Sequence, residues 1–276
     1  ARYREAGRSI KAGEYLIDLN NSPRQLLRSF RRGTLPKQVR LTIPEGFNRW
    51  QIADLLAKSR LGSRSQFLKW FKVNRLEGRL FPDTYLFRSD SNLAQVTQKL
   101  TVRFRAVWQN ISGLGEAIDP ESDKGREMIT LASLVEKESG LSDEQRKIAR
   151  VFRNRLRLGM KLQTDPTCVY AENLYMKKPH PKYCKDRTNR YSTYVIDGLP
   201  PSPISNPGRT ALMAVAKPYD GPNASKLLFF VARGDGSGRH TFSENYQDPQ
   251  RAVRTYVRSR QQLRNRRAGN TSHGTP

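Results

Sequence analysis

The clearest candidate for acid–base chemistry is a glutamate near the end of a helix-forming segment. Residues 125–139 repeat apolar side chains at helical spacing, and the apolar stripe passes through Leu131 and Val135. Glu138 lies near this stripe, whereas Glu136 is expected further round, nearer solvent. Burial raises the pKa of a carboxyl, as a general acid requires near neutral pH. Considered alone, this segment is better explained by a structural glutamate at the helix end, bonded to a nearby arginine, than by a general acid.

Two later segments carry groups that could hold a sugar. Gln163-Thr164-Asp165-Pro166-Thr167 places an amide, hydroxyls and a carboxylate in a tight turn, suited to sugar hydroxyls and acetamides, although the turn could equally hold only a self-bonded aspartate. Tyr191-Ser192-Thr193-Tyr194 and the proline-rich residues 198–208 form an aromatic-edged stretch, and tyrosine faces suit the apolar faces of sugar rings. A structural proline-rich loop is the simpler interpretation.

Several helices and short strands must position these groups. Strands are expected at residues 14–19, 39–43, 227–232 and 240–243, and the third of them as a buried strand. Helices are expected at 23–30, 50–57, 65–71, 93–111, 125–139, 142–158, 208–216 and 247–263. Ser142 to Gln145 is expected to form a capping box, and Asn206-Pro207 to cap the helix that follows it. These elements predict an α+β protein.

The composition indicates a folded, strongly basic chain. It has 276 residues and 36% hydrophobic residues, with 50 Lys and Arg against 25 Asp and Glu, a net charge of +25. Such a surface suits nucleic acid, anionic lipid or an acidic wall polymer, and it also fits a merely solvated face. The longest clean apolar run, Leu227 to Ala232, is too short to cross a bilayer.

The cysteines and histidines restrict the metal chemistry. His180, His240 and His273 are scattered, so no Cys/His cluster has the spacing of zinc ligands, and we expect no metal and no organic cofactor. The two cysteines, Cys168 and Cys184, could close a loop of about 16 residues worth roughly 3 kcal/mol, or remain two free thiols in the cytosol.

Seven motifs in order carry a resemblance to one family. They are Ala132 to Ser139, Val151 to Leu156, Leu162 to Thr167, Tyr191 to Tyr194, Gly198 to Pro201, Asn206 to Gly208 and His240 to Ser243. Leu76 to Gly78 and Phe81 to Tyr85 match the family's interdomain stretch. Because of these motifs, the chain resembles the MltG/YceG-like endolytic murein transglycosylases from about Gly13 to Tyr256.

The resemblance implies an α+β architecture, with a small LysM-like α/β module before a mixed helical and strand catalytic domain. We assign residues 1–62 to the LysM-like module, truncated at its start, 63–120 to a helical linker region and 121–258 to the YceG-like catalytic domain. Residues 259–276 form a basic tail that is expected to be disordered. The family is anchored in the inner membrane by a single N-terminal helix that is absent here, with this part facing the periplasm or cell exterior.

The resemblance also implies the activity. Such an enzyme cleaves the β-1,4 bond between MurNAc and GlcNAc and leaves 1,6-anhydro-MurNAc ends. We assign the role of the single residue that acts first as acid and then as base to Glu138. Glu138 lies near the apolar stripe, and Glu138-Ser139 is similar to the Glu-Ser pair of other lytic transglycosylases. Glu136 is the alternative. The expected glycan contacts are Gln163, Thr164, Asp165, Tyr191, Tyr194 and Asn206.

The expected partners follow from the same resemblance. They are peptidoglycan glycan strands and the peptidoglycan synthases of the elongation and division machinery. The chain departs from the family pattern at Ser192, usually Asn, and at Ser202, usually Gly, and residues 171–190 match poorly. The glycan contacts near Ser192 are the ones in doubt.

Two rival functions remain at the level of sequence. A non-catalytic peptidoglycan-binding protein would use the LysM-like module as an anchor and would cleave no glycan. A Glu138→Gln variant of such a protein would leave every activity unchanged. A nucleic-acid-binding protein would explain the net charge and would show steeply salt-dependent affinity, but the chain has no zinc finger, RNP or similar motif. We therefore expect no nucleic-acid partner.

Overall fold

The computed structural model describes residues 10–11, 15, 17, 20–33, 37–111 and 118–245. Its elements are α2 (Pro23–Arg32), β1 (Gln38–Thr42), α3 (Arg49–Lys58), α4 (Arg64–Asn74), β2 (Thr84–Arg88), α5 (Leu93–Gln109), α6 (Asp123–Glu138), α7 (Ser142–Arg157), α8 (Asp165–Cys168), α9 (Pro181–Cys184), α10 (Arg209–Ala216), the 3-10 turn η1 (Ala224–Lys226), β3 (Phe229–Ala232) and β4 (His240–Ser243). This mixture of helices and small sheets is consistent with the predicted α+β class.

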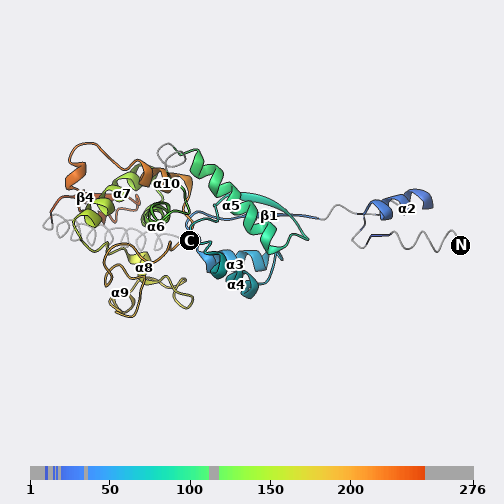
Figure 1. The fold of residues 1–276 in the computed structure, drawn as a ribbon, viewed down its shortest axis with the longest axis horizontal. Helices are drawn as coiled ribbons and strands as arrows, with labels where there is room; N and C mark the ends of the chain where they lie inside the picture. Colours follow the sequence, from blue (N-terminus) through green and yellow to red (C-terminus); the bar gives the residue numbers. More distant parts are fainter. Residues whose placement is uncertain are drawn as a thin grey trace, which may run out of the picture.

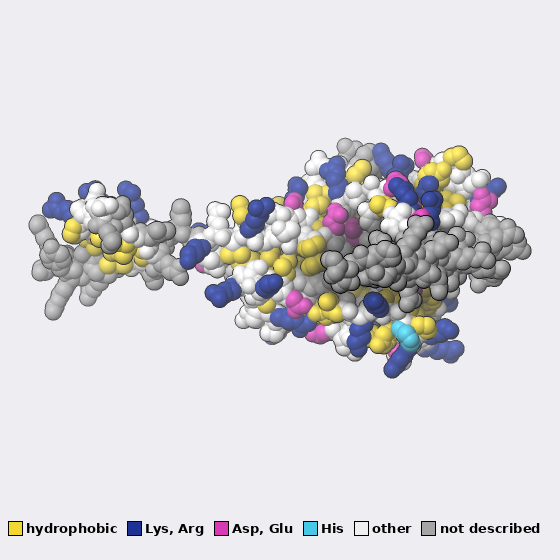
Figure 2. Space-filling view, turned by 180° about the vertical axis from the view of Figure 1, so that it is seen from behind, with side chains coloured by type: hydrophobic (Ala, Val, Ile, Leu, Met, Phe, Trp, Pro, Cys, Tyr) yellow, Lys and Arg dark blue, Asp and Glu magenta, His cyan; other side chains and the backbone are white. Residues whose placement is uncertain are grey.

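Part of the predicted secondary structure concerns residues that the structure does not describe. The expected strand at 14–19 lies largely outside the described residues, and the expected helix at 247–263 and the basic tail lie wholly outside them. Within the described part, none of the helices combines the length and the apolar content that a membrane span requires. Figure 2 shows Lys and Arg side chains scattered over the visible face, with acidic side chains among them.

An N-terminal body, residues 37–111, is built on a strand pair of which only the first strand was predicted. β1 pairs antiparallel with β2, with Thr42 opposite Thr84 and Gln38 opposite Arg88. One face of this pair is buried under α3, α4 and α5, which lie together in Figure 1. Its core consists of apolar side chains from all five elements and their connections: Leu41, Ile43, Ile52, Leu56, Phe67, Phe71, Leu80, Tyr85 and Leu100. The predicted boundary between residues 62 and 63 falls inside this one core.

A second body, residues 118–245, covers most of the segment predicted to be the catalytic domain, and we refer to it as the catalytic body. Its helices α6, α7 and α10 contact one another and bury a second core, which includes Ile129, Leu131, Leu134, Val135, Ile148, Phe152, Leu212 and Val215. β3 and β4 pair antiparallel beside α7, with Phe229 opposite Ser243. Both strands were expected, but β3 begins two residues later than predicted and is half-buried rather than buried. Figure 1 shows α8 and α9 on one side of this bundle.

Two predicted helix caps are wrong. α7 begins at Ser142 itself, so Ser142 is a helical residue and Leu141 precedes it without a side-chain cap. Gln145 instead donates its amide to the Ser139 carbonyl oxygen at 2.8 Å. At α10 the residue before the helix is Gly208, without a side-chain cap, because the Asn206 amide is used elsewhere.

Candidate active site

Glu138 is the last residue of α6 and is half-buried where that helix meets a loop of the catalytic body. Burial, with a smaller contribution from the negative charge of Asp165, raises the pKa of its carboxyl to about 7. The Thr164 hydroxyl and the Arg155 guanidinium oppose this rise. Apart from the Glu138 carboxyl beside it, the buried Thr164 hydroxyl has no hydrogen-bond partner among the residues that the structure describes. The carboxyl therefore titrates where a general acid is needed.

Backbone and hydroxyl hydrogen bonds bring two distant motifs together beside Glu138. The Gln163 amide donates to the Thr193 carbonyl oxygen at 3.1 Å, and the Thr164 amide donates to Thr193 Oγ1 at 2.9 Å. Gln163 takes a left-handed backbone with φ of 50°, and its side chain is exposed. Tyr194 donates its hydroxyl to Asp165 Oδ1 at 2.6 Å. Four predicted site residues, Gln163, Thr164, Asp165 and Tyr194, thus gather on one loop pair.

A buried arginine, which sequence reasoning did not single out, completes this group. Arg155 on α7 donates from Nε to the Leu228 carbonyl oxygen and from a terminal nitrogen to the Leu162 carbonyl oxygen, each at 2.7 Å. Its guanidinium also lies 5.2 Å from the Phe229 ring centre. Its position on the buried face of α7, with Phe152 one turn earlier and Ile148 two turns earlier, is the sequence signal that could have identified it.

Glu136 has a different set of neighbours from Glu138. Its Oε2 accepts a hydrogen bond from the Gly208 amide at 3.0 Å, and Glu45 and Lys137 are its nearest charges. Glu136 is the less deeply buried of the two carboxyls, as the helical spacing predicted, yet burial raises its pKa to about 7 as well. A Cβ atom at Gly208 would lie 1.8 Å from Oε1 of the exposed Glu45 side chain, so a larger residue here would displace that carboxylate.

The remaining predicted residues, Tyr191 and Asn206, form their hydrogen bonds with groups other than Glu138. The Tyr191 hydroxyl hydrogen-bonds Ser202 Oγ at 2.8 Å, and its ring centre lies 4.6 Å from that of Tyr170. Asn206 is fully buried. Its Oδ1 accepts from the Leu80 amide at 2.9 Å, while its Nδ2 donates to the Phe47 carbonyl oxygen at 3.0 Å.

Asn206 belongs to a buried network that joins the two bodies. Glu77, in the turn after α4, accepts hydrogen bonds from Asn206 Nδ2 at 3.1 Å, from the Tyr170 hydroxyl and from the Arg49 amide. Burial raises the pKa of Glu77 to about 7 against the pull of Arg49. Glu77, Arg49 and Tyr170 were missed, and a carboxylate between Leu76 and Gly78 in an apolar stretch was the available signal.

A disulfide links the end of α8 to the end of α9. Cys168 and Cys184 are bonded, which decides between the two states that the sequence allowed. Ser192 is fully buried against this bridge and donates its hydroxyl to the Cys184 carbonyl oxygen at 2.7 Å. The bridge closes a loop of 16 positions, worth about 3 kcal/mol in the chain-entropy model. It therefore secures the short helix α8, on which Asp165 and Thr167 lie.

Comparison with known proteins assigns the chain to a family. The family model described as the YceG-like family matches residues 1–255, and the chain belongs to that family. It is 26% identical over 281 residues to an endolytic murein transglycosylase of Bacillus subtilis strain 168, which covers 91% of this chain and 74% of that protein. It is 28% identical to the endolytic murein transglycosylase of Streptococcus pneumoniae strain D39, with 91% of this chain covered but about half, 51%, of the relative.

A solved structure has the same fold. The crystal structure of a YceG-like protein from Listeria monocytogenes superimposes with a TM-score of 0.65 at 26% identity. The match covers 91% of this chain and 87% of the other. The architecture described above is therefore shared along nearly the whole chain.

Proposed function

We propose that this protein is an endolytic lytic transglycosylase of peptidoglycan that cleaves the β-1,4 bond between MurNAc and GlcNAc. Its family membership and the names of its relatives support the enzyme class. The observation that carries the chemistry is the half-buried Glu138, with a pKa of about 7, beside the loop of Gln163, Thr164 and Asp165. A carboxyl that is still protonated near neutral pH can act as a general acid.

Glu138 performs both proton transfers in this proposal. It first protonates the oxygen that leaves with GlcNAc, while the substrate acetamide stabilises the positive charge that develops at C1 of MurNAc. The ionised Glu138 then takes the proton from the 6-hydroxyl of MurNAc as that oxygen bonds to C1. The product carries a 1,6-anhydro ring, and Glu138 ends the cycle protonated. No water and no second carboxylate take part.

The neighbours of Glu138 position the glycan and set its pKa. Gln163 is exposed on the loop and is suited to bind a sugar acetamide or hydroxyl, and Thr164 orients the carboxyl. Tyr194 and Asp165 form a hydrogen-bonded pair at the edge of this group. Tyr191 lies further along, against Ser202. We assign Asn206 to positioning rather than to substrate contact, because its amide is buried and fully used inside the protein.

Asp165 gives a second candidate reaction. It is exposed and near enough to Glu138 to raise the pKa of that carboxyl. A pair of carboxyls is what a glycoside hydrolase uses, one as acid and one to activate water or attack C1. The same site would then release reducing MurNAc ends.

Mass spectrometry of cleaved glycan strands distinguishes these reactions. Purified, uncross-linked strands incubated with the protein are expected to yield internal cuts that end in 1,6-anhydro-MurNAc. An Asp165→Asn variant is expected to keep this product at a rate within about tenfold of the unaltered protein, since it changes only a neighbouring charge. Reducing ends that disappear in Asp165→Asn would instead establish the hydrolase.

The pH dependence provides an independent test of the acid. Because Glu138 must carry its proton in the free enzyme, kcat/KM is expected to be level below its pKa of about 7 and to fall by about tenfold per pH unit above it. Initial rates between pH 5 and 9 measure this limb. Glu136→Gln, which removes the other half-buried carboxyl of the helix, should retain it. A profile that stays flat to pH 9 contradicts the assignment.

The cellular setting follows from the substrate. Murein lies outside the cytoplasm, and the Cys168–Cys184 disulfide is typical of an oxidising compartment. We propose that the protein works there, held at the inner membrane and alongside peptidoglycan synthases.

A further inference from the structure

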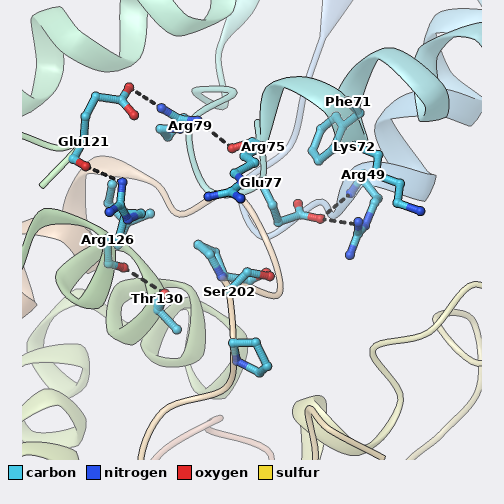
Figure 3. Close-up of a pocket in the computed structure, with 13 residues that line it drawn as sticks. Arg49, Phe71, Lys72, Arg75, Glu77, Arg79, Glu121, Arg126, Thr130 and Ser202 are labelled. Carbon is cyan, nitrogen blue, oxygen red and sulfur yellow. Dashed lines mark hydrogen bonds and ion pairs between the residues drawn. The ribbon is translucent and has the colours of Figure 1, made fainter. Parts of the chain in front are cut away.

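A cavity of about 450 Å³ lies between the N-terminal body and the catalytic body, and Glu138 is not among its lining residues. Its walls come from α4 and the turn that follows it, from α6, and from the segment Pro201 to Pro203 (Figure 3). It is therefore a second site, separate from the loop pair around Glu138.

Positive charge predominates on the lining of this cavity. Five cationic residues, Arg49, Lys72, Arg75, Arg79 and Arg126, face only two carboxylates, Glu77 and Glu121.

Two of these cations are available for a ligand. Arg49 Nε lies 3.3 Å from Glu77 Oε2, and Arg79 is paired with Glu121. Lys72 and Arg75 have exposed side chains and form no ion pair with any residue that the structure describes. The cavity thus has cationic groups to spare for an anion.

The rest of the lining is apolar and closely packed. Phe71, Ile129 and Pro203 contribute carbon surface, and Thr130 and Ser202 contribute hydroxyls. Gly78 has φ of 82°, and a Cβ atom there would lie 2.5 Å from Ile129 Cγ2, so the turn approaches α6 as closely as a backbone can. An occupant that combines an anionic end with aliphatic carbon, as a peptide does, matches this surface.

The cavity is within reach of the scissile bond. α6 runs from Thr130 at the cavity to Glu138, eight residues or about 12 Å along the helix axis. The hydrogen bond between Tyr191 and Ser202 connects the segment Tyr191 to Tyr194, which was predicted to contact the glycan, to the cavity wall. A four-residue peptide in extended form spans about 13 Å. A peptide branch on a glycan bound at Glu138 can therefore extend into the cavity.

Resting on the proposed function, we propose that this cavity binds a carboxylate of the stem peptide on the strand being cleaved, with Lys72 and Arg75 as its ligands. The enzyme would then read the peptide as well as the sugar.

Kinetics on paired substrates test the assignment. Strands with intact stem tetrapeptides and the same strands stripped of peptide by an amidase are compared for the unaltered protein, for Lys72→Gln/Arg75→Gln, and for a matched double variant, Arg40→Gln/Lys58→Gln. The matched variant removes two exposed cations of the same body outside the cavity. We expect KM for peptide-bearing strands to rise roughly tenfold or more in the cavity variant alone, with kcat little changed.

The comparison has two outcomes that would overturn the proposal. One is an unchanged KM for peptide-bearing strands in the cavity variant. The other is an equal rise in KM for stripped strands, which would assign Lys72 and Arg75 to the glycan itself.

A binding measurement that needs no catalysis separates this proposal from the proposed function. Glu138→Gln is titrated by NMR with the free tetrapeptide, with the same peptide fully amidated at its carboxyls, and with inorganic phosphate. The acid should bind at least about tenfold more tightly than the amide, and phosphate should not displace it at equal concentration. Displacement by phosphate would indicate a general anion site and overturn the peptide assignment. Peptide binding without any strand cleavage by the unaltered protein would contradict the proposed function alone.

Discussion

Replacing Glu138 with glutamine is expected to lower kcat for strand cleavage by about 10³-fold or more, because one carboxyl supplies both proton transfers. The amide keeps the size and the neighbours of the side chain but can neither donate nor accept the proton. Glu136→Gln is the matched control, since Glu136 is also half-buried on α6 with a pKa of about 7. It is expected to lose less than tenfold, because the amide oxygen can still accept the Gly208 hydrogen bond. The opposite ranking of the two variants would transfer the catalytic role to Glu136.

The stability of the same variant shows whether lost activity reflects chemistry or unfolding. Glu138 has a folded pKa of about 7, above the ordinary value of 4.5, so its contribution is fully present below pH 4.5 and is lost as pH rises through 7. A glutamine at this position does not ionise, so the variant does not lose this stability as the pH rises. Thermal unfolding at pH 8 should therefore show Glu138→Gln at least as stable as the unaltered protein, by up to roughly 1–3 kcal/mol, with no gain at pH 4.5.

Replacing Asn206 with alanine is expected to cost about 2–4 kcal/mol of unfolding free energy. The change leaves the Leu80 amide without its acceptor and removes one donor from buried Glu77. Both losses occur where the N-terminal body meets the catalytic body. Chemical denaturation followed by circular dichroism measures the effect.

Asn74→Ala is the matched control for this variant. Its amide donates to the Trp70 carbonyl oxygen at 2.8 Å from an exposed position, so its loss should cost no more than about 0.5 kcal/mol. An Asn206→Ala variant of unaltered stability, but with a raised KM for glycan strands, would contradict the positioning role and return Asn206 to the substrate contacts.

Helices and their buried faces could be predicted from the sequence because the signal is local. The spacing of Leu131, Val135 and Glu138 predicts both the helix and the burial of its last carboxyl, and the pKa of Glu138 is raised as expected. The ordered motifs predicted the family. The failed cap at Ser142 shows where local reasoning ends, because the Gln145 amide bonds back to Ser139 instead of supporting a cap.

The parts that were missed depend on partners far along the chain. β2 was missed because Tyr85-Leu86-Phe87 reads as continuous apolar sequence, whereas only Tyr85 and Phe87 are buried and Leu86 is 52% exposed. The structural role of Glu77 depends on the hydrogen bonds that it accepts from Tyr170 and Asn206, which lie 93 and 129 positions away in the sequence. Arg155 lay within a recognised motif, but its role follows from the carbonyl oxygens of Leu162 and Leu228.

The pairing of β1 with β2 also has a consequence for the order of folding. Thr42 and Thr84 face each other 42 positions apart, and the chain between them forms α3 and α4. Closing a loop of this length has an entropic cost of several kcal/mol that local contacts do not offset, so we expect the sheet to form only once the helices have collapsed. The N-terminal body should therefore unfold as one cooperative unit, and a chain divided anywhere between residues 43 and 83 should leave two fragments that fold only together.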